Sequence, residues 1–165
     1  MTTTNSISST KRMVWVALFT AITCILAPLS IPIPISPVPI TLTNLVLFIS
    51  LYILSWKEAL ISYILYLLLG ICGLPVFSGF SGGIGKLAGP TGGYLAGFIF
   101  LILIAGFFMK IFPKKKTLTI LGMVLGMAAT YIFGTLWLAA QMELSFTAAL
   151  SVGVFPYLLG DAVKI

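Results

Sequence analysis

Two charged residues near the carboxyl end, Asp161 and Lys164, are the side chains whose type and spacing point most directly to chemistry. They are three residues apart in a segment with no other charge after Glu143, so a helix would place them on one face. Ionisable residues within an apolar segment are costly and by default mark a binding site or a pathway. The alternative is an ion pair that neutralises itself on one helix face, but it does not explain why a pair occurs here.

A glycine-rich stretch, residues 73–94 (GLPVFSGFSGGIGKLAGPTGGY), is the second candidate element. Gly85-Lys86 resembles the end of a phosphate-binding loop. However, Phe80 stands where that motif needs glycine, and Leu87 stands where it needs serine or threonine. The sequence therefore shows no ATP site of its own. The glycines would allow backbone amides to approach a ligand closely, and the alternative is a flexible outer loop.

Other kinds of chemistry have little support. The sequence has no histidine, and Cys24 and Cys72 are isolated in or beside apolar runs. We therefore expect no metal site and no catalytic site, and an enzyme is disfavoured because no nucleophile stands beside a base. The basic residues do not form a stripe along one helix, so we expect no nucleic-acid partner.

The composition predicts a membrane protein. Sixty per cent of the 165 residues are hydrophobic and seven per cent are charged, whereas a soluble domain carries about 25% charged residues. The length suits one domain. We expect residues 1–10 to be a disordered tail and residues 11–165 to be a single integral membrane substrate-binding domain.

The apolar runs predict an all-α bundle of six transmembrane helices. The expected spans cover residues 13–29, 41–55, 59–71, 95–112 and 117–140, with a sixth beginning near Pro156. Four prolines in residues 31–40 lack the amide donor that a helix needs, so this segment is expected to be an extended connector.

The sixth span is short. Fewer than ten residues follow Tyr157, whereas about 20 are needed to cross a bilayer. Either this helix begins earlier, near Phe146, or the sequence stops part-way through it, and we favour the second interpretation.

Basic residues predict the orientation, because they are enriched in cytoplasmic loops. With a cytoplasmic amino terminus, the inner connections contain most of the basic residues: Lys11, Arg12, Lys57, Lys110 and Lys114 to Lys116. The proline segment, the glycine-rich stretch and the start of the last helix then lie outside. We expect the irregular outer loops to form a lid over a binding site.

Two pairs of small residues have the spacing that lets helices approach closely in lipid, Ala17 with Ala21 and Gly122 with Gly126. For the glycines, packing within the bundle is the favoured interpretation.

Three regions together resemble the biotin-specific BioY family, the substrate-binding S components of energy-coupling factor (ECF) transporters. They are PVPITLTNL (37–45), GLPVFSGFSGG with GPTGGY (73–83 and 89–94), and FPYLLGDAVK (155–164). The resemblance covers nearly the whole chain.

This resemblance implies a six-helix subunit of the bacterial cell membrane that captures biotin from outside and performs no chemistry on it. A transmembrane coupling protein (T component) and two ATP-binding-cassette ATPases would drive uptake. The implied biotin-binding residues are Asp161, Lys164, Tyr94, Ser81, Gly82, Gly83, Thr43 and Asn44. Ala17 and Ala21 would contact the coupling protein.

The ligand's chemistry fits these residues. Asp161 could accept hydrogen bonds from the ureido N–H groups of biotin, and Phe77, Phe80 and Tyr94 could supply apolar walls. Two positions depart from the family: Ser81 where some members have asparagine, and Leu95 where some have arginine. The missing arginine leaves open what holds the biotin carboxylate, and Lys86 is a conceivable substitute.

Alternatives remain. The closest is an S component for another small vitamin. A channel or a structural membrane protein is less favoured, because a pore would need polar residues through several spans.

Overall fold

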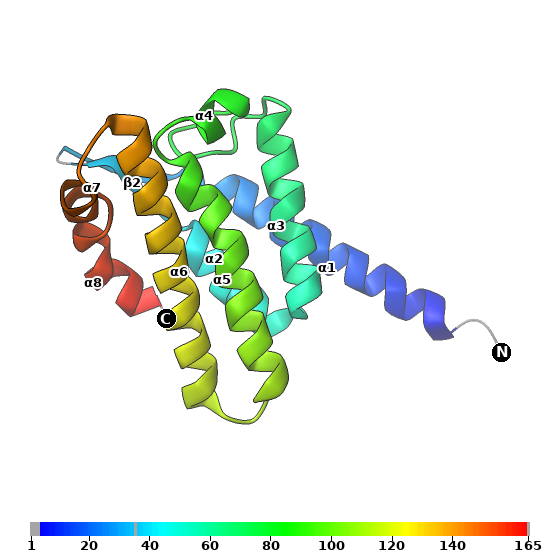
Figure 1. Cartoon of the computed structure of the whole chain (residues 1–165). Coiled ribbons are helices and arrows are strands. Elements are labelled where there is room, and N and C mark those ends of the chain that lie inside the picture. Colours follow the sequence, from blue (N-terminus) through cyan, green and yellow to red (C-terminus); the bar gives the residue numbers. More distant parts are fainter. Residues whose placement is uncertain (1–3, 35, 165) are drawn as a thin grey trace.

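The computed structural model describes residues 4–34 and 36–164 and is mostly helical (Figure 1). Its helices are α1 (Thr4–Leu26), α2 (Thr43–Ile53), α3 (Trp56–Ile71), α4 (Ile84–Ala88), α5 (Gly92–Ile111), α6 (Lys116–Met142), α7 (Phe146–Gly153) and α8 (Phe155–Lys164). A two-stranded antiparallel sheet, β1 (Ser30–Ile33) and β2 (Ser36–Thr41), follows α1.

Residues 4–10 were expected to be part of a disordered tail, but in the structure they belong to α1, which begins at Thr4. No proline or glycine occurs between this residue and Leu26, so nothing in the sequence interrupts propagation of the helix. Residues 1–3 lie outside the described part of the chain. Figure 1 shows the amino-terminal part of α1 projecting beyond the other helices.

The proline segment has the extended backbone that its composition predicts, and it folds back on itself as a hairpin. Ser30 pairs with Thr41 and Ile31 with Ile40. In a two-stranded sheet many amides point away from the partner strand, so prolines can be accommodated. The end of β2 leads directly into α2 and so brings Thr41 close to Asn44.

Helices α5 and α6 lie side by side over most of their length (Figure 1). A Cβ atom on Gly126 would lie 2.9 Å from the Cα and carbonyl oxygen of Leu101, and one on Gly122 would lie 2.5 Å from Cβ of Phe108. The contact therefore depends on both glycines. The prediction that this pair packs within the bundle is confirmed.

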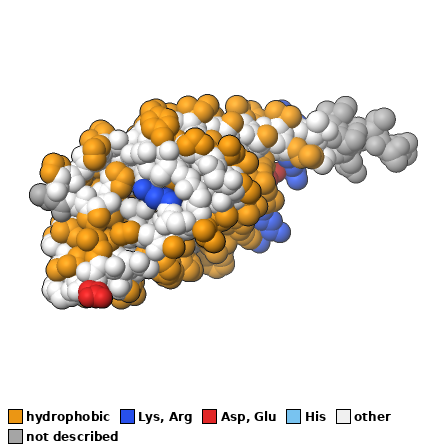
Figure 2. Space-filling view, turned by 90° about the horizontal axis from the view of Figure 1, so that it is seen from above, with side chains coloured by type: hydrophobic (Ala, Val, Ile, Leu, Met, Phe, Trp, Pro, Cys, Tyr) orange, Lys and Arg blue, Asp and Glu red, His pale blue; other side chains and the backbone are white. Residues whose placement is uncertain are grey.

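Within the described residues, three helices are long and apolar enough to cross a membrane: α1, α5 and α6. The pair α7 and α8 passes the same test together, bent by 44°. Pro156 explains the break, because its ring would clash with a carbonyl of the preceding turn in one continuous helix. Figure 2 shows hydrophobic side chains over the flanks of the molecule.

The expected six-helix, all-α arrangement is thus coarser than the observed one. The described segments contain eight helices and a small sheet, since α4 forms inside the glycine-rich stretch and α7 precedes α8. The α5–α6 turn lies at the opposite end of the bundle from α4 (Figure 1). Lys114 and Lys115, in that turn, are therefore far from the irregular segments.

Candidate ligand-binding site

A cavity of about 70 Å³ lies between the hairpin and the helices. This volume is smaller than the range of about 300–1,000 Å³ that is usual for small-molecule sites. Its lining comes from β2, α2, α3, the segments before α5, the first turns of α5, α6, the end of α7 and α8. Apolar side chains such as Ile40, Phe98 and Met127 contribute to the lining together with several polar groups.

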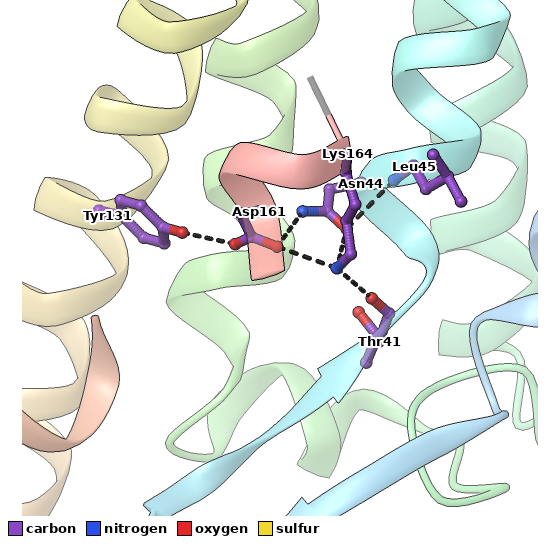
Figure 3. Close-up of polar contacts among 6 residues, drawn as sticks. All are labelled: Thr41, Asn44, Leu45, Tyr131, Asp161 and Lys164. Carbon is purple, nitrogen blue, oxygen red and sulfur yellow. Dashed lines mark hydrogen bonds and ion pairs between the residues drawn. The ribbon is translucent and has the colours of Figure 1, made fainter. Parts of the chain in front are cut away.

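Asp161 is the centre of a polar network on one side of the cavity (Figure 3). Its Oδ1 accepts hydrogen bonds from Nδ2 of Asn44 at 2.7 Å and from Nζ of Lys164 at 2.9 Å. Its Oδ2 accepts from the hydroxyl of Tyr131 at 2.5 Å. Only 14% of the Asp161 side chain is exposed, so the network holds a shielded carboxylate in one orientation.

Lys164 uses all three of its ammonium donors within the protein. Besides Asp161, Nζ donates to the carbonyl oxygen of Thr41 at 2.9 Å and to Oδ1 of Asn44 at 3.0 Å. An ammonium group has three N–H donors, so none is left for a ligand in this arrangement. Lys164 therefore fixes α8 against the end of β2 and the start of α2.

Two groups of the network keep unused capacity. Asn44 has two amide hydrogens and donates one of them to Asp161. Oδ2 of Asp161 accepts from Tyr131 and can accept a second bond. The network can thus offer a ligand one donor and one acceptor next to each other.

Tyrosine side chains hold the ends of several helices and β2 together around the cavity. The hydroxyl of Tyr94 donates to the carbonyl oxygen of Gly153 at 3.0 Å. A Cβ on Gly134 would lie 2.4 Å from the Tyr94 ring, so this glycine gives the ring its space. The hydroxyl of Tyr157 contacts the carbonyl oxygen of Val38 and donates to Oγ of Ser36 at 2.7 Å, which ties α8 to β2.

Five of the predicted site residues line this one cavity. They are Thr43, Asn44, Tyr94, Asp161 and Lys164.

The other three predicted residues, Ser81, Gly82 and Gly83, are not part of the lining in this structure. Oγ of Ser81 donates to the carbonyl oxygen of Ser78. A Cβ on Gly82 would lie 2.3 Å from the carbonyl oxygen of Leu74, and Gly83 has a φ of +86°. These residues shape the turn that precedes α4.

Three side chains considered for ligand contact also lie away from the cavity. Phe77 is fully buried against Tyr66, with ring centroids 5.5 Å apart, and Phe80 is 65% exposed. Lys86 is half-buried on α4 outside the lining, and burial lowers the pKa of its amine. Ala17 and Ala21 are exposed on α1, where a partner could reach them.

Several residues of the lining could not be predicted from the sequence: Tyr66, Ser78, Thr91, Tyr131 and Tyr157. Tyr131 matters most of these because it contacts Asp161 directly. Tyrosine is common within and at the ends of apolar spans. Nothing in the spacing of Tyr131 distinguishes it from a packing residue.

The fold and the cavity define a multi-pass helical membrane protein with a shielded carboxylate at the edge of a small-molecule site. The family model "BioY family" matches residues 1–165. The chain belongs to the BioY family.

Similar proteins include a probable biotin transporter BioY of Pyrococcus horikoshii, 38% identical over 93% of this chain and 89% of the relative. A biotin transporter BioY of Thermotoga maritima is 35% identical, covering 94% of this chain and 89% of the relative. A solved structure, the S-component for biotin from an ECF-type ABC transporter, matches with a TM-score of 0.85 and 30% identity. That match covers 99% of this chain and 88% of the other. These relatives are transporters or transporter components and not enzymes.

Proposed function

We propose that this chain is the biotin-binding S component of an ATP-driven ECF vitamin transporter. The observation that carries the proposal is the orientation of Asp161, whose carboxylate is shielded, held by three side chains and placed at the cavity. Family membership and the likeness to a biotin S component support the same ligand.

The ureido ring of biotin matches the unused capacity of the network. This ring has two N–H donors and one carbonyl acceptor. One N–H donates to Oδ2 of Asp161, and the carbonyl oxygen accepts the remaining amide hydrogen of Asn44. Lys164 is a positioning residue, because its donors already hold Asp161, Asn44 and Thr41. The thiophane ring and aliphatic chain lie against the apolar lining.

Uptake then depends on partner proteins. A transmembrane coupling protein and two ATPases supply the energy, because the sequence contains no phosphate-binding loop. The exposed α1 face with Ala17 and Ala21 is the docking surface for the coupling protein, since small residues allow close helix contact.

The chain lies in the bacterial cell membrane with its amino terminus in the cytoplasm, as the bias of basic residues favours. Residues 11–165 form one membrane domain. We count six spans in this domain. Five are α1, α2, α3, α5 and α6, and the sixth is α7 with α8 as one broken span. The segment with α4 and the hairpin forms the outer lid.

Competition binding tests the ligand assignment. Purified chain is saturated with labelled biotin and then exposed to an excess of unlabelled biotin, thiamine or riboflavin. Displacement by biotin alone is the expected result. Displacement by another vitamin at lower concentration than biotin would assign this chain to that vitamin.

A further inference from the structure

Tyr66 on α3 has a buried hydroxyl without a partner. Its side chain lines the cavity and is 0% exposed, and its hydroxyl has no hydrogen-bond partner within residues 4–34 and 36–164. The ring is held between Tyr63 and Phe77, with centroids 5.6 and 5.5 Å away. An unmade hydrogen bond at a buried hydroxyl is destabilising, so such a group calls for an explanation.

The cavity offers no uncommitted cation to an anionic ligand. Among the described residues that line it, the charged ones are Asp161 and Lys164, and these are paired with each other at 2.9 Å. Lys86 lies outside the lining. A carboxylate that enters the cavity must therefore find neutral donors.

Such donors occur at the amino-terminal end of α5, which lines the same cavity as Tyr66. Thr91 is the N-cap residue of this 20-residue helix, is 8% exposed and lines the cavity. Its side chain makes no capping hydrogen bond, so its hydroxyl remains available. The amino-terminal end of a helix carries a partial positive charge that favours an anion.

We propose that Tyr66, Thr91 and the amino-terminal end of α5 form a neutral subsite for the carboxylate of the ligand. The Tyr66 hydroxyl donates a hydrogen bond to one carboxylate oxygen, and the helix end stabilises the negative charge. The Asp161 network takes the other, ureido end of biotin. The inference rests on the proposed function.

The test measures dissociation constants for two ligands, biotin and an analogue whose chain ends in a methyl group in place of the carboxylate. Tyr66→Phe should weaken biotin binding about tenfold, as expected for a lost hydrogen bond to a charged group. It should leave the affinity for the methyl-ended analogue within about twofold. The melting temperature of the unliganded variant should not fall, because the removed hydroxyl bonds to no described group.

Tyr63→Phe is the matched control one turn away. The hydroxyl of Tyr63 donates to the carbonyl oxygen of Leu95 at 2.7 Å, so its removal should lower the melting temperature. The preference for biotin over the analogue should stay unchanged. An equal loss of both ligands in Tyr66→Phe, or no loss of either, would overturn the subsite. Failure of the unaltered protein to bind biotin would instead overturn the proposed function.

Discussion

The hydroxyl of Tyr131 on α6 donates a 2.5 Å hydrogen bond to Oδ2 of Asp161 on α8. This bond joins two helices across a sequence separation of 30 residues. With Asn44 and Lys164 on the other carboxylate oxygen, it gives Asp161 a fixed direction toward the cavity. The helix that carries the carboxylate is short, so its neighbours determine where the carboxylate lies.

Tyr131→Phe should weaken biotin binding about fivefold to twentyfold. A hydrogen bond to a charged group contributes about 1.5–3 kcal/mol. Removing the Tyr131 hydroxyl lets the carboxylate of Asp161 turn, and part of that energy is then lost from biotin binding. Titration calorimetry measures the change. Tyr52→Phe is the control, since Tyr52 is 58% exposed on α2, and it should bind as the unaltered protein does. Equal affinities of the two variants would show that Tyr131 does not position Asp161.

Lys164→Met should lower both the melting temperature and the affinity for biotin. The change removes three hydrogen bonds and leaves a carboxylate with only 14% side-chain exposure without its counterion. Breaking one partner of a buried pair costs about 3–5 kcal/mol. In the double variant Asp161→Asn/Lys164→Met the unpaired charge is gone. Its melting temperature should therefore recover in part, while biotin binding stays weak. A double variant no more stable than Lys164→Met would argue against this pairing.

The sequence was a sufficient guide to the long apolar helices and to the extended proline segment. It did not reveal the hairpin, because composition alone does not say which extended residues pair with which. The start of α1 at Thr4 was also missed, since a polar run without helix breakers can continue a helix that is stable further along. The bend between α7 and α8 follows from Pro156, but its 44° angle depends on packing.

At the site, the charged pair was predictable because ionisable groups are unusual in an apolar segment, whereas Asn44 was implied only by the family resemblance. Tyr66 and Tyr131 were not predictable, since only the three-dimensional arrangement places their side chains at the cavity. Gly82 and Gly83 remain predicted ligand contacts from family resemblance, and in this structure they lie outside the lining.

Gly126→Ala should destabilise the protein by about 1–3 kcal/mol, the usual cost of overpacking. The added methyl would lie 2.9 Å from backbone atoms of Leu101, so α5 would have to shift. Gly85→Ala is the control because no atom lies within 4 Å of its added Cβ. Thermal unfolding in detergent compares the two. A Gly126 variant as stable as the Gly85 variant would contradict close α5–α6 packing.

Ala17→Phe should leave biotin binding by the isolated chain unchanged, because Ala17 is exposed on α1 and does not line the cavity. Co-purification with the coupling protein should be lost, since a large ring prevents close helix contact. Ala128→Phe introduces the same ring at an exposed position of α6 and should leave assembly intact. Normal assembly of the Ala17 variant would place the coupling protein on another face.

Equilibrium binding of labelled biotin to the purified chain and to its Asp161→Asn variant tests the central claim most directly. The substitution keeps the size of the side chain but removes the charge and replaces one acceptor oxygen with a donor. We expect saturable binding to the unaltered chain, and at least tenfold weaker binding to the variant. An unchanged dissociation constant in the variant, or no binding to either protein, would contradict the assignment of Asp161 as the residue that captures biotin.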